Sequence, residues 1–457
     1  MKNNLKSSLA TWASVLLLGA AVTSCKQELN EVQPDANKNA ARVAATIELG
    51  NCGEDVQITE STTWTNDNEY IIRGYIRVLA GAVLTIEAGT VIKGDCDGTL
   101  IIERGAQIQA EGTAAQPVLF TSINNLDVPA SGDWGGIVIL GRASNNQAPN
   151  VRIEGVERVG DPPTAETLGF FGPGTSKDDE SFDTESSGTL RYVRIEYAGR
   201  ELTPNNEINS LTLGGVGSGT VLDHISVIYA RDDAFEFFGG TVNAKYLYAF
   251  ATQDDDFDTD LGHRGNIQFA LAVRDRSRAD ISGSNGIETD NNVLANANEL
   301  PRTSTTFSNV TVLLSNPNPV APAFFENGIL LRRGSAAGVY NSAVAGFPFG
   351  YALRDPDVTP CERLGSITVF VPGIANSVGD FCGSESFPLP FPDPKDFGFG
   401  SSFRVGIPDG GNPVLFEGTD FSQLDASFFE PTSFRGASDE FGSNWDFNSA
   451  WLPDLFQ

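Results

Sequence analysis

Residues 223–271 read DHISVIYARDDAFEFFGGTVNAKYLYAFATQDDDFDTDLGHRGNIQFAL, and the apolar runs of this stretch recur at a fixed spacing. Ile225, Leu247 and Phe269 take equivalent places in these runs. A fixed period of roughly 20 residues, with β-rich runs separated by turn residues, is typical of a stack of β-coils. The period therefore predicts that equivalent residues lie one above another.

Acidic residues follow the same period, since Asp233 and Asp255 keep one offset within it. Strands of neighbouring coils lie about 4.8 Å apart, so two stacked carboxylates repel each other unless a cation, a proton or a donor lies between them. We expect either a bound group at this place or side chains that point apart.

The composition suits a turn-rich β protein with an aromatic interior and little helix. The 457 residues include 48 Gly and 30 Phe, and the formal net charge is −29. Repeat proteins can exceed the usual domain size because each coil packs only on its neighbours. The charge excludes non-specific binding to nucleic acid and favours cations, basic partners or simple solubility.

The N-terminus has the pattern of an export signal. Lys2 and Lys6 precede an apolar run from Leu9 to Val22, which is too short for a stable membrane span. The ending V-T-S-C resembles the lipobox of bacterial lipoproteins, which implies a lipid on Cys25 and an anchor in the membrane. Lys26-Gln27-Glu28 is similar to signals for the outer face of the outer membrane, so surface display is expected.

Four further cysteines predict two disulfides, because an even count in an exported chain indicates pairing. The separation of Cys52 and Cys96 is close to two coils, and that of Cys361 and Cys382 is close to one. The alternative of a four-cysteine zinc site fails because no CxxC spacing is present.

Short apolar strands and glycine turns alternate before the repeat: YIIRGYIRV starts at Tyr70, AVLTIEAGTVIKG at Ala82 and LIIERGAQIQAEG at Leu100. With GDWGGIVILG and DDAFEFFGG, these runs resemble a largely uncharacterised family of bacterial right-handed parallel β-helix lipoproteins over residues 60–360. The resemblance implies an all-β, single-stranded, pectate-lyase-like parallel β-helix. It implies no particular activity.

The expected organisation has four parts with two interruptions of the coils. Residues 157–189 and 276–304 are rich in turn residues and predict long loops that leave the stack. The four parts are a signal peptide at 1–24, a flexible tether at 25–46, the β-helix at 47–384 and a C-terminal capping region at 385–457. In the cap, Trp445 and Trp451 are expected to pack rather than bind.

The acidic residues of the repeat are candidates for calcium, because hard oxygen ligands suit this ion. The candidate set is Asp233, Asp255, Asp256 and Asp258. Strand alternation would place Asp254, Asp256, Asp258 and Asp260 on one face. The alternative is that these acids are solvated or cap turns. The segment is no EF-hand loop, since the glycine and the final glutamate of that loop are missing.

Catalytic residues remain unknown from sequence. Polygalacturonase-type glycosidases of this fold use an Asp, an Asp-Asp pair and a Gly-His-Gly on successive coils; Asp233 and Asp255-Asp256 match the first two. His263 follows Asp256 too closely to lie one coil further on, so it is out of step with the acids. A lyase would use calcium with a basic residue. The nearest basic residues are Lys245, Arg264, Arg274, Arg276 and Arg278.

These observations predict a surface lipoprotein whose β-helix serves binding or adhesion, to glycans or surface proteins, with calcium as the expected ion. The alternative is a calcium-dependent polysaccharide lyase or glycoside hydrolase acting on acidic polysaccharide. An enzyme would concentrate acidic and basic groups in one place beside the long loops, whereas a binder would spread them along the stack.

Overall fold

The computed structural model describes residues 44–124, 130–156, 168–203, 206–292, 298–315, 324–354, 363–370, 385–387, 419–438, 445 and 449–452. The chain divides into two units, Met1–Arg42 and Val43–Gln457, and the described strands all lie in the second. Apart from these strands, the described residues form one short 3-10 helix, η1 (Glu180–Phe182). None of the described residues forms a helix of the length and apolarity that crossing a bilayer requires.

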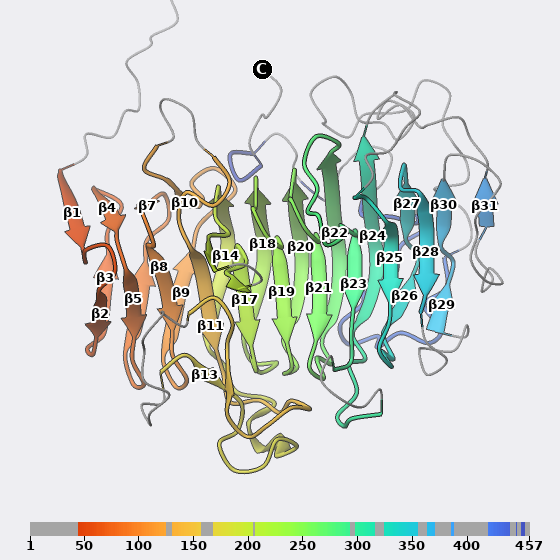
Figure 1. Ribbon diagram of the computed structural model, residues 1–457, viewed down its shortest axis with the longest axis horizontal. Coiled ribbons are helices and arrows are strands. Elements are labelled where there is room, and N and C mark those ends of the chain that lie inside the picture. The colour runs from red at the N-terminus through yellow and green to blue at the C-terminus, as the bar shows by residue number, and fades with distance from the viewer. Residues whose placement is uncertain are drawn as a thin grey trace, which may run out of the picture. The chain divides into compact units, whose positions relative to one another are not determined.

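The strands form two long parallel sheets, as expected for a right-handed single-stranded parallel β-helix (Figure 1). The ten-stranded sheet contains β2 (Asp55–Ile58), β5 (Tyr75–Val78), β8 (Thr99–Ile102), β11 (Gly136–Leu140), β17 (Leu211–Gly214), β19 (Phe235–Phe238), β21 (Phe257–Asp260), β23 (Ile287–Thr289), β25 (Asn327–Leu331) and β28 (Phe349–Leu353). Each strand pairs in parallel with the strand of the next coil, so the fold prediction is confirmed.

The seventeen-stranded sheet forms the other side of the coils. It contains β1 (Ala45–Leu49), β3 (Thr62–Trp64), β4 (Asn68–Ile72), β6 (Val83–Ile86), β7 (Val91–Gly94), β9 (Gln107–Glu111), β10 (Val118–Ser122), β14 (Gly188–Glu196), β18 (Val221–Ile228), β20 (Asn243–Phe250), β22 (Asn266–Asp275), β24 (Thr306–Ser315), β26 (Gly338–Tyr340), β27 (Ala343–Ala345), β29 (Leu364–Gly365), β30 (Thr368–Phe370) and β31 (Glu385–Phe387). Two small antiparallel pairs join β12 (Val151–Arg152) to β13 (Phe170–Phe171), and β15 (Glu201–Thr203) to β16 (Asn206–Glu207).

The register confirms the period at most positions and corrects it at one. Ile225 pairs with Leu247 as the period predicts, but Leu247 pairs with Ala270, one position beyond the expected Phe269. Phe269 is therefore not equivalent to Leu247. Phe269 and Tyr246 both have a positive φ, of 59° and 56°, and their rings stack 5.0 Å apart. One extra residue between the two strands shifts the register.

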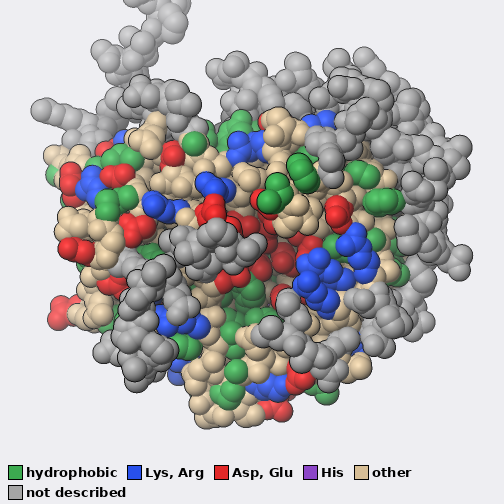
Figure 2. Space-filling view, in the orientation of Figure 1, with side chains coloured by type: hydrophobic (Ala, Val, Ile, Leu, Met, Phe, Trp, Pro, Cys, Tyr) green, Lys and Arg blue, Asp and Glu red, His purple; other side chains and the backbone are tan. Residues whose placement is uncertain are grey.

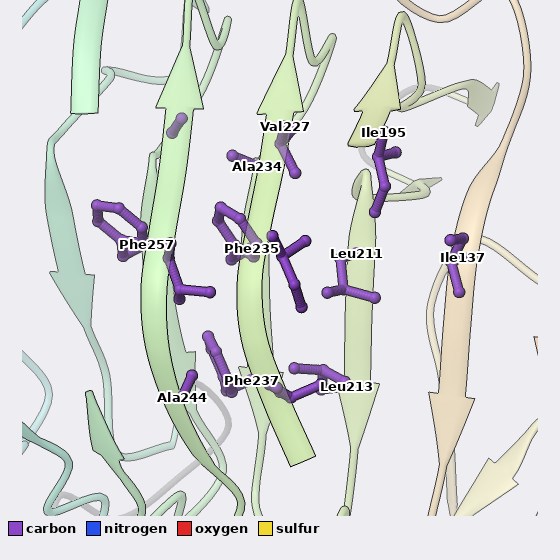
Figure 3. Close-up of a cluster of buried hydrophobic side chains, with 14 of the residues drawn as sticks. Ile137, Ile195, Leu211, Leu213, Val227, Ala234, Phe235, Phe237, Ala244 and Phe257 are labelled. Carbon is purple, nitrogen blue, oxygen red and sulfur yellow. The ribbon is translucent and has the colours of Figure 1, made fainter. Parts of the chain in front are cut away.

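The interior is built from like residues stacked along the coils. Leu211, Phe235 and Phe257 are paired in register and fully buried, and the two phenylalanine rings lie 5.7 Å apart (Figure 3). Burial of each such side chain contributes about 1.5–3 kcal/mol. Because side chains alternate along a strand, the residue after each of these points outward. The buried columns thus fix which side chains the ten-stranded sheet presents outside.

The C-terminal region covers the outer face of the seventeen-stranded sheet. Trp445 and Trp451 are both 0 % exposed, and their rings stack 5.9 Å apart, so the prediction that they pack is confirmed. Ser226 donates to the carbonyl of Trp451 at 2.9 Å, and the amide N–H of Ala437 donates to Thr311 at 2.9 Å. The described part of the predicted cap therefore lies along a flank of the coils; residues 388–418 lie outside the described residues.

Cys52 and Cys96 form the predicted disulfide, with their Cα atoms 6.0 Å apart. The bond joins segments 44 residues apart, at the start of the stack. The carboxylate of Asp97 lies beside it and accepts from the amide N–H groups of Gly53 and Gly74, at 2.9 and 3.2 Å. The predictions for Cys25, Cys361 and Cys382 concern positions outside the described residues.

Replacing both cysteines, as Cys52→Ser with Cys96→Ser, is expected to destabilise the first coils by about 3–4 kcal/mol, because a closed loop of this size loses its constraint on the unfolded chain. Hydrogen exchange should become faster in β2 and β5 and stay unchanged in β19 and β21. If β2 and β5 exchange as slowly in the variant as in the wild type, the prediction is contradicted.

Candidate functional site

Carboxylates gather on the outer face of the ten-stranded sheet. Thr212, Glu236, Asp258 and Glu288 stand in register on β17, β19, β21 and β23 and alternate with the buried columns. Figure 2 shows the acidic side chains gathered in a hollow of this face. We call the following set the acidic face: Asp232, Asp233, Glu236, Asp254, Asp255, Asp258 and Glu288.

A ladder of one polar residue per coil runs along the start of these strands. Its members are Asn209, Asp233, Asp255, Asn285 and Asn327. The Oδ1 of each accepts the backbone N–H of the next: Asn209 from Asp233 at 3.2 Å, Asp233 from Asp255 at 2.7 Å, Asp255 from Asn285, and Asn285 from Asn327 at 3.1 Å. A backbone donor therefore lies between Asp233 and Asp255, which is one of the outcomes that the period predicted.

Asparagine meets the demand of the ladder as well as aspartate does, because the ladder uses one side-chain oxygen. The amide groups of Asn209 and Asn285 also donate to neighbouring acids, Asn209 to Glu236 and Asn285 to Glu288 at 2.7 Å. Asp233 and Asp255 have no such donor to offer. Their charges add repulsion that the fold does not require.

The carboxylates form three groups whose oxygens lie within 4.8 Å of one another. These groups are Asp232, Asp233 and Asp254; Asp233, Glu236 and Asp258; and Asp255, Asp258 and Glu288. The glutamates and Asp258 lie on neighbouring strands, and the other aspartates lie in the turns just before β19 and β21. Buried Oδ1 atoms of Asp254 and Asp258 have no hydrogen-bond partner among the described residues. Clustered hard oxygens of this kind can coordinate a divalent cation.

Burial raises the pKa of every carboxyl group on the acidic face, because water no longer solvates the charged form. Repulsion adds to burial: the pKa of Asp233 is raised well above its usual range by burial and by Asp255, and that of Asp258 by burial and again by Asp255. Burial also raises the pKa of the nearby Asp260 to about 7. These groups hold protons, or need cations, at a pH where exposed carboxyls are ionised.

Three of the four predicted calcium ligands lie on this face and one does not. Asp233, Asp255 and Asp258 are brought together, but Asp256 points inward and pairs with Arg274 at 3.1 Å, with both side chains fully buried. Asp256 therefore lies apart from the other three candidates, in the turn that precedes β21.

Glu288 lies outside the set of predicted ligands, because the composition of residues 276–304 predicts one long loop. They contain β23, which pairs with β21 and returns to the stack. The signal was present, since I-E-T-D at 287–290 has the same pattern of apolar and acidic residues as F-D-T-D at 257–260.

Arginines border the acidic face on its C-terminal side. Arg332 is ion-paired with Glu288 and, at 2.8 Å, with Asp290, while Arg333 also pairs with Asp290. A patch of basic side chains lies beside the acidic hollow in Figure 2. Of the basic residues predicted from sequence, Lys245 lies on β20 of the other sheet and pairs with Glu430 of the C-terminal segment. Arg264 pairs with Asp183 in the 168–187 segment.

Two segments between strands of the coils, the described parts of 141–187 and of 290–305, meet next to this face. The amide of Asn146 donates to the Asn291 carbonyl at 2.7 Å, its backbone N–H donates to the Leu261 carbonyl at 3.0 Å, and Lys177 pairs with Glu299. These contacts join segments that are far apart in the chain and meet beside β21 and β23. The acidic and basic groups are therefore concentrated in one place, beside these segments, which is the arrangement expected of the enzyme rather than of the binder.

His263 is separated from the acidic face, as its spacing predicted. It is 0 % exposed, its Nδ1 lies 2.8 Å from Thr305 Oγ1, and its Nε2 lies 3.2 Å from the Val242 carbonyl. Burial lowers its pKa to about 3. It cannot serve as the histidine of a polygalacturonase-type arrangement.

A family model described as a pectate-lyase-like β-helix domain matches residues 56–370. The chain belongs to this family. The matched range covers the coils that carry the acidic face and agrees with the resemblance noted from residues 60–360. No curated protein and no solved structure matches the chain.

Aspartate-to-asparagine and aspartate-to-alanine changes in the ladder should act in opposite directions. Asp255→Asn keeps the acceptor for the Asn285 N–H and removes a charge, so the melting temperature without divalent cations at pH 7.5 should rise. Asp255→Ala leaves a buried N–H without its acceptor and should cost about 1–3 kcal/mol. Thermal unfolding checks both; a loss of stability in the asparagine variant equal to that in the alanine variant would contradict the ladder.

Without divalent cations, stability should fall as the pH rises. A carboxyl whose pKa is raised in the folded state binds its proton more tightly than in the unfolded chain, where its pKa is about 4. The stabilisation is complete below about pH 4 and is lost as the pH passes through the folded values, such as about 7 for Asp260. Urea unfolding between pH 4 and 8 measures this; stability that increases over the range would contradict it.

Proposed function

We propose that this chain is a cell-surface scaffold whose β-helix binds a glycan at the acidic face, with calcium bound there. The observation that carries the proposal is the pair of aspartates in the ladder. Asp233 and Asp255 occupy positions where asparagine meets the structural need, and their charges lie among further carboxylates. Their negative charges lower the stability of the fold, and we therefore infer that they serve binding.

Calcium suits this face because it accepts six to eight oxygen ligands in flexible geometry. The carboxylates supply some of these ligands, and glycan hydroxyl or carboxylate oxygens complete the set. An acidic glycan would otherwise be repelled by the same face. Cation dependence is therefore the expected property of binding to an acidic polysaccharide.

The location follows from the N-terminal sequence. A lipid on Cys25 would anchor the chain in the outer membrane, and the residues between Cys25 and β1, which begins at Ala45, would hold the β-helix away from the bilayer. The partners of the proposal are thus the membrane, through the lipid, and glycans or surface proteins, through the folded coils. The net charge of −29 argues against nucleic acid as a partner.

A second candidate is a polysaccharide lyase or glycoside hydrolase that acts at the same face. It is favoured by the concentration of acidic groups with Arg332 and Arg333 beside the two segments between strands. Carboxyl groups with raised pKa values can act as general acids near neutral pH. Arginines can hold a substrate carboxylate by two hydrogen bonds.

A glycan screen distinguishes the two. Polyuronides and neutral glycans are tested for binding and turnover, with and without calcium, for wild type and for Asp233→Asn with Asp255→Asn. Glu87→Gln, which removes one carboxylate from an exposed turn of an early coil, is the matched control. Calcium-dependent binding that the double variant loses at least tenfold supports the scaffold. Turnover by the wild type that is lost in the double variant supports the enzyme. Glycan binding that is unchanged in the double variant contradicts both proposals.

A further inference from the structure

Two of the carboxylate groups on the acidic face share one residue. Asp258 belongs both to the group with Asp233 and Glu236 and to the group with Asp255 and Glu288. It stands in the middle strand of the three, between Glu236 on β19 and Glu288 on β23. A carboxylate in this position can contact two ions with its two oxygens.

Thr212 supplies an independent sign of a ligand. Its side chain is 1 % exposed, and its hydroxyl has no hydrogen-bond partner in the part of the chain that the structure describes. It pairs in register with Glu236 and points to the same side, because its neighbours Leu211 and Leu213 face the core. A buried hydroxyl without a partner costs about 1–3 kcal/mol, which coordination or a bound water would offset.

The spacing of the oxygens fits an ion of the size of calcium. Two ligands on opposite sides of an ion that binds oxygen at 2.3–2.6 Å lie about 4.6–5.2 Å apart. The oxygens of each group lie within 4.8 Å of one another. The coils that carry them are themselves spaced by about 4.8 Å, so each pair of neighbouring coils can hold one ion.

The charges favour more than one divalent ion. The two groups together contain five carboxylates, and Arg332 offsets one of them through its pair with Glu288. Glu154, Asp232 and Asp254 add further negative charge beside Glu236 and Asp233. A single divalent ion would therefore leave most of these buried carboxylates in repulsion.

We propose that the two groups form one two-cation centre bridged by Asp258, an inference that rests on the cation-bound acidic face of the proposed function. Asp233, Glu236 and the Thr212 hydroxyl hold the first ion. Asp255 and Glu288 hold the second. Asn209 and Asn285 position the two glutamates by their hydrogen bonds and keep them in place for coordination.

Calcium titration of the full chain by isothermal calorimetry, with no glycan present, tests the centre. We expect two calcium ions per chain for wild type and for Glu87→Gln. Glu236→Gln should bind one ion, and Glu288→Gln should also bind one. Asp258→Asn should weaken both by at least tenfold. These changes keep the shape of each side chain, and thermal unfolding confirms that each variant is folded.

Three results would overturn the centre: a stoichiometry of one or zero in the wild type, two ions retained by Glu236→Gln, or the loss of one ion only in Asp258→Asn. Failure of the proposed function is distinguishable. Two bound ions without any glycan binding would support the centre and contradict the glycan scaffold. One bound ion with calcium-dependent glycan binding would contradict the centre and support the scaffold.

Discussion

The structure depends on the stacking of parallel coils at a spacing of about 4.8 Å, which places each residue on its equivalent in the next coil. For apolar residues the result is a continuous core, as in the column of Leu211, Phe235 and Phe257. For asparagine it is a hydrogen-bonded ladder. For aspartate and glutamate the same spacing creates repulsion, because burial and neighbouring charges both disfavour the ionised form.

On the acidic face the same spacing lowers the stability of the fold, because it brings carboxylates close together. Asp233 and Asp255 satisfy the ladder with one oxygen each, yet they bring charge into a row of other carboxylates. Replacement of a ladder residue by asparagine would relieve the repulsion without loss of the hydrogen bond. The proposed cation would be coordinated by the aspartate charges, which asparagine cannot supply, and this is how the proposal connects the fold to binding.

The fold and the stacking of Asp233 on Asp255 could be predicted from the period. The Cys52–Cys96 disulfide could be predicted from the even number of cysteines together with a separation of about two coils. The remaining features depend on local departures from the period. Phe269 is not equivalent to Leu247, because its coil is one residue longer than the coil before it. Asp256 lies in the turn before β21, where it pairs with the buried Arg274. Glu288 could not be predicted from the period, because additional residues between β21 and β23 lengthen its coil.

The position of bound ions tests the central claim most directly. Crystals grown at neutral pH with terbium, which occupies calcium sites, would give anomalous difference peaks at any cation on the acidic face. We predict two peaks, one on each side of Asp258, with the first near Thr212. A map without peaks on this face, or with Asp233 and Asp255 contacting only protein groups, would contradict the two-cation centre.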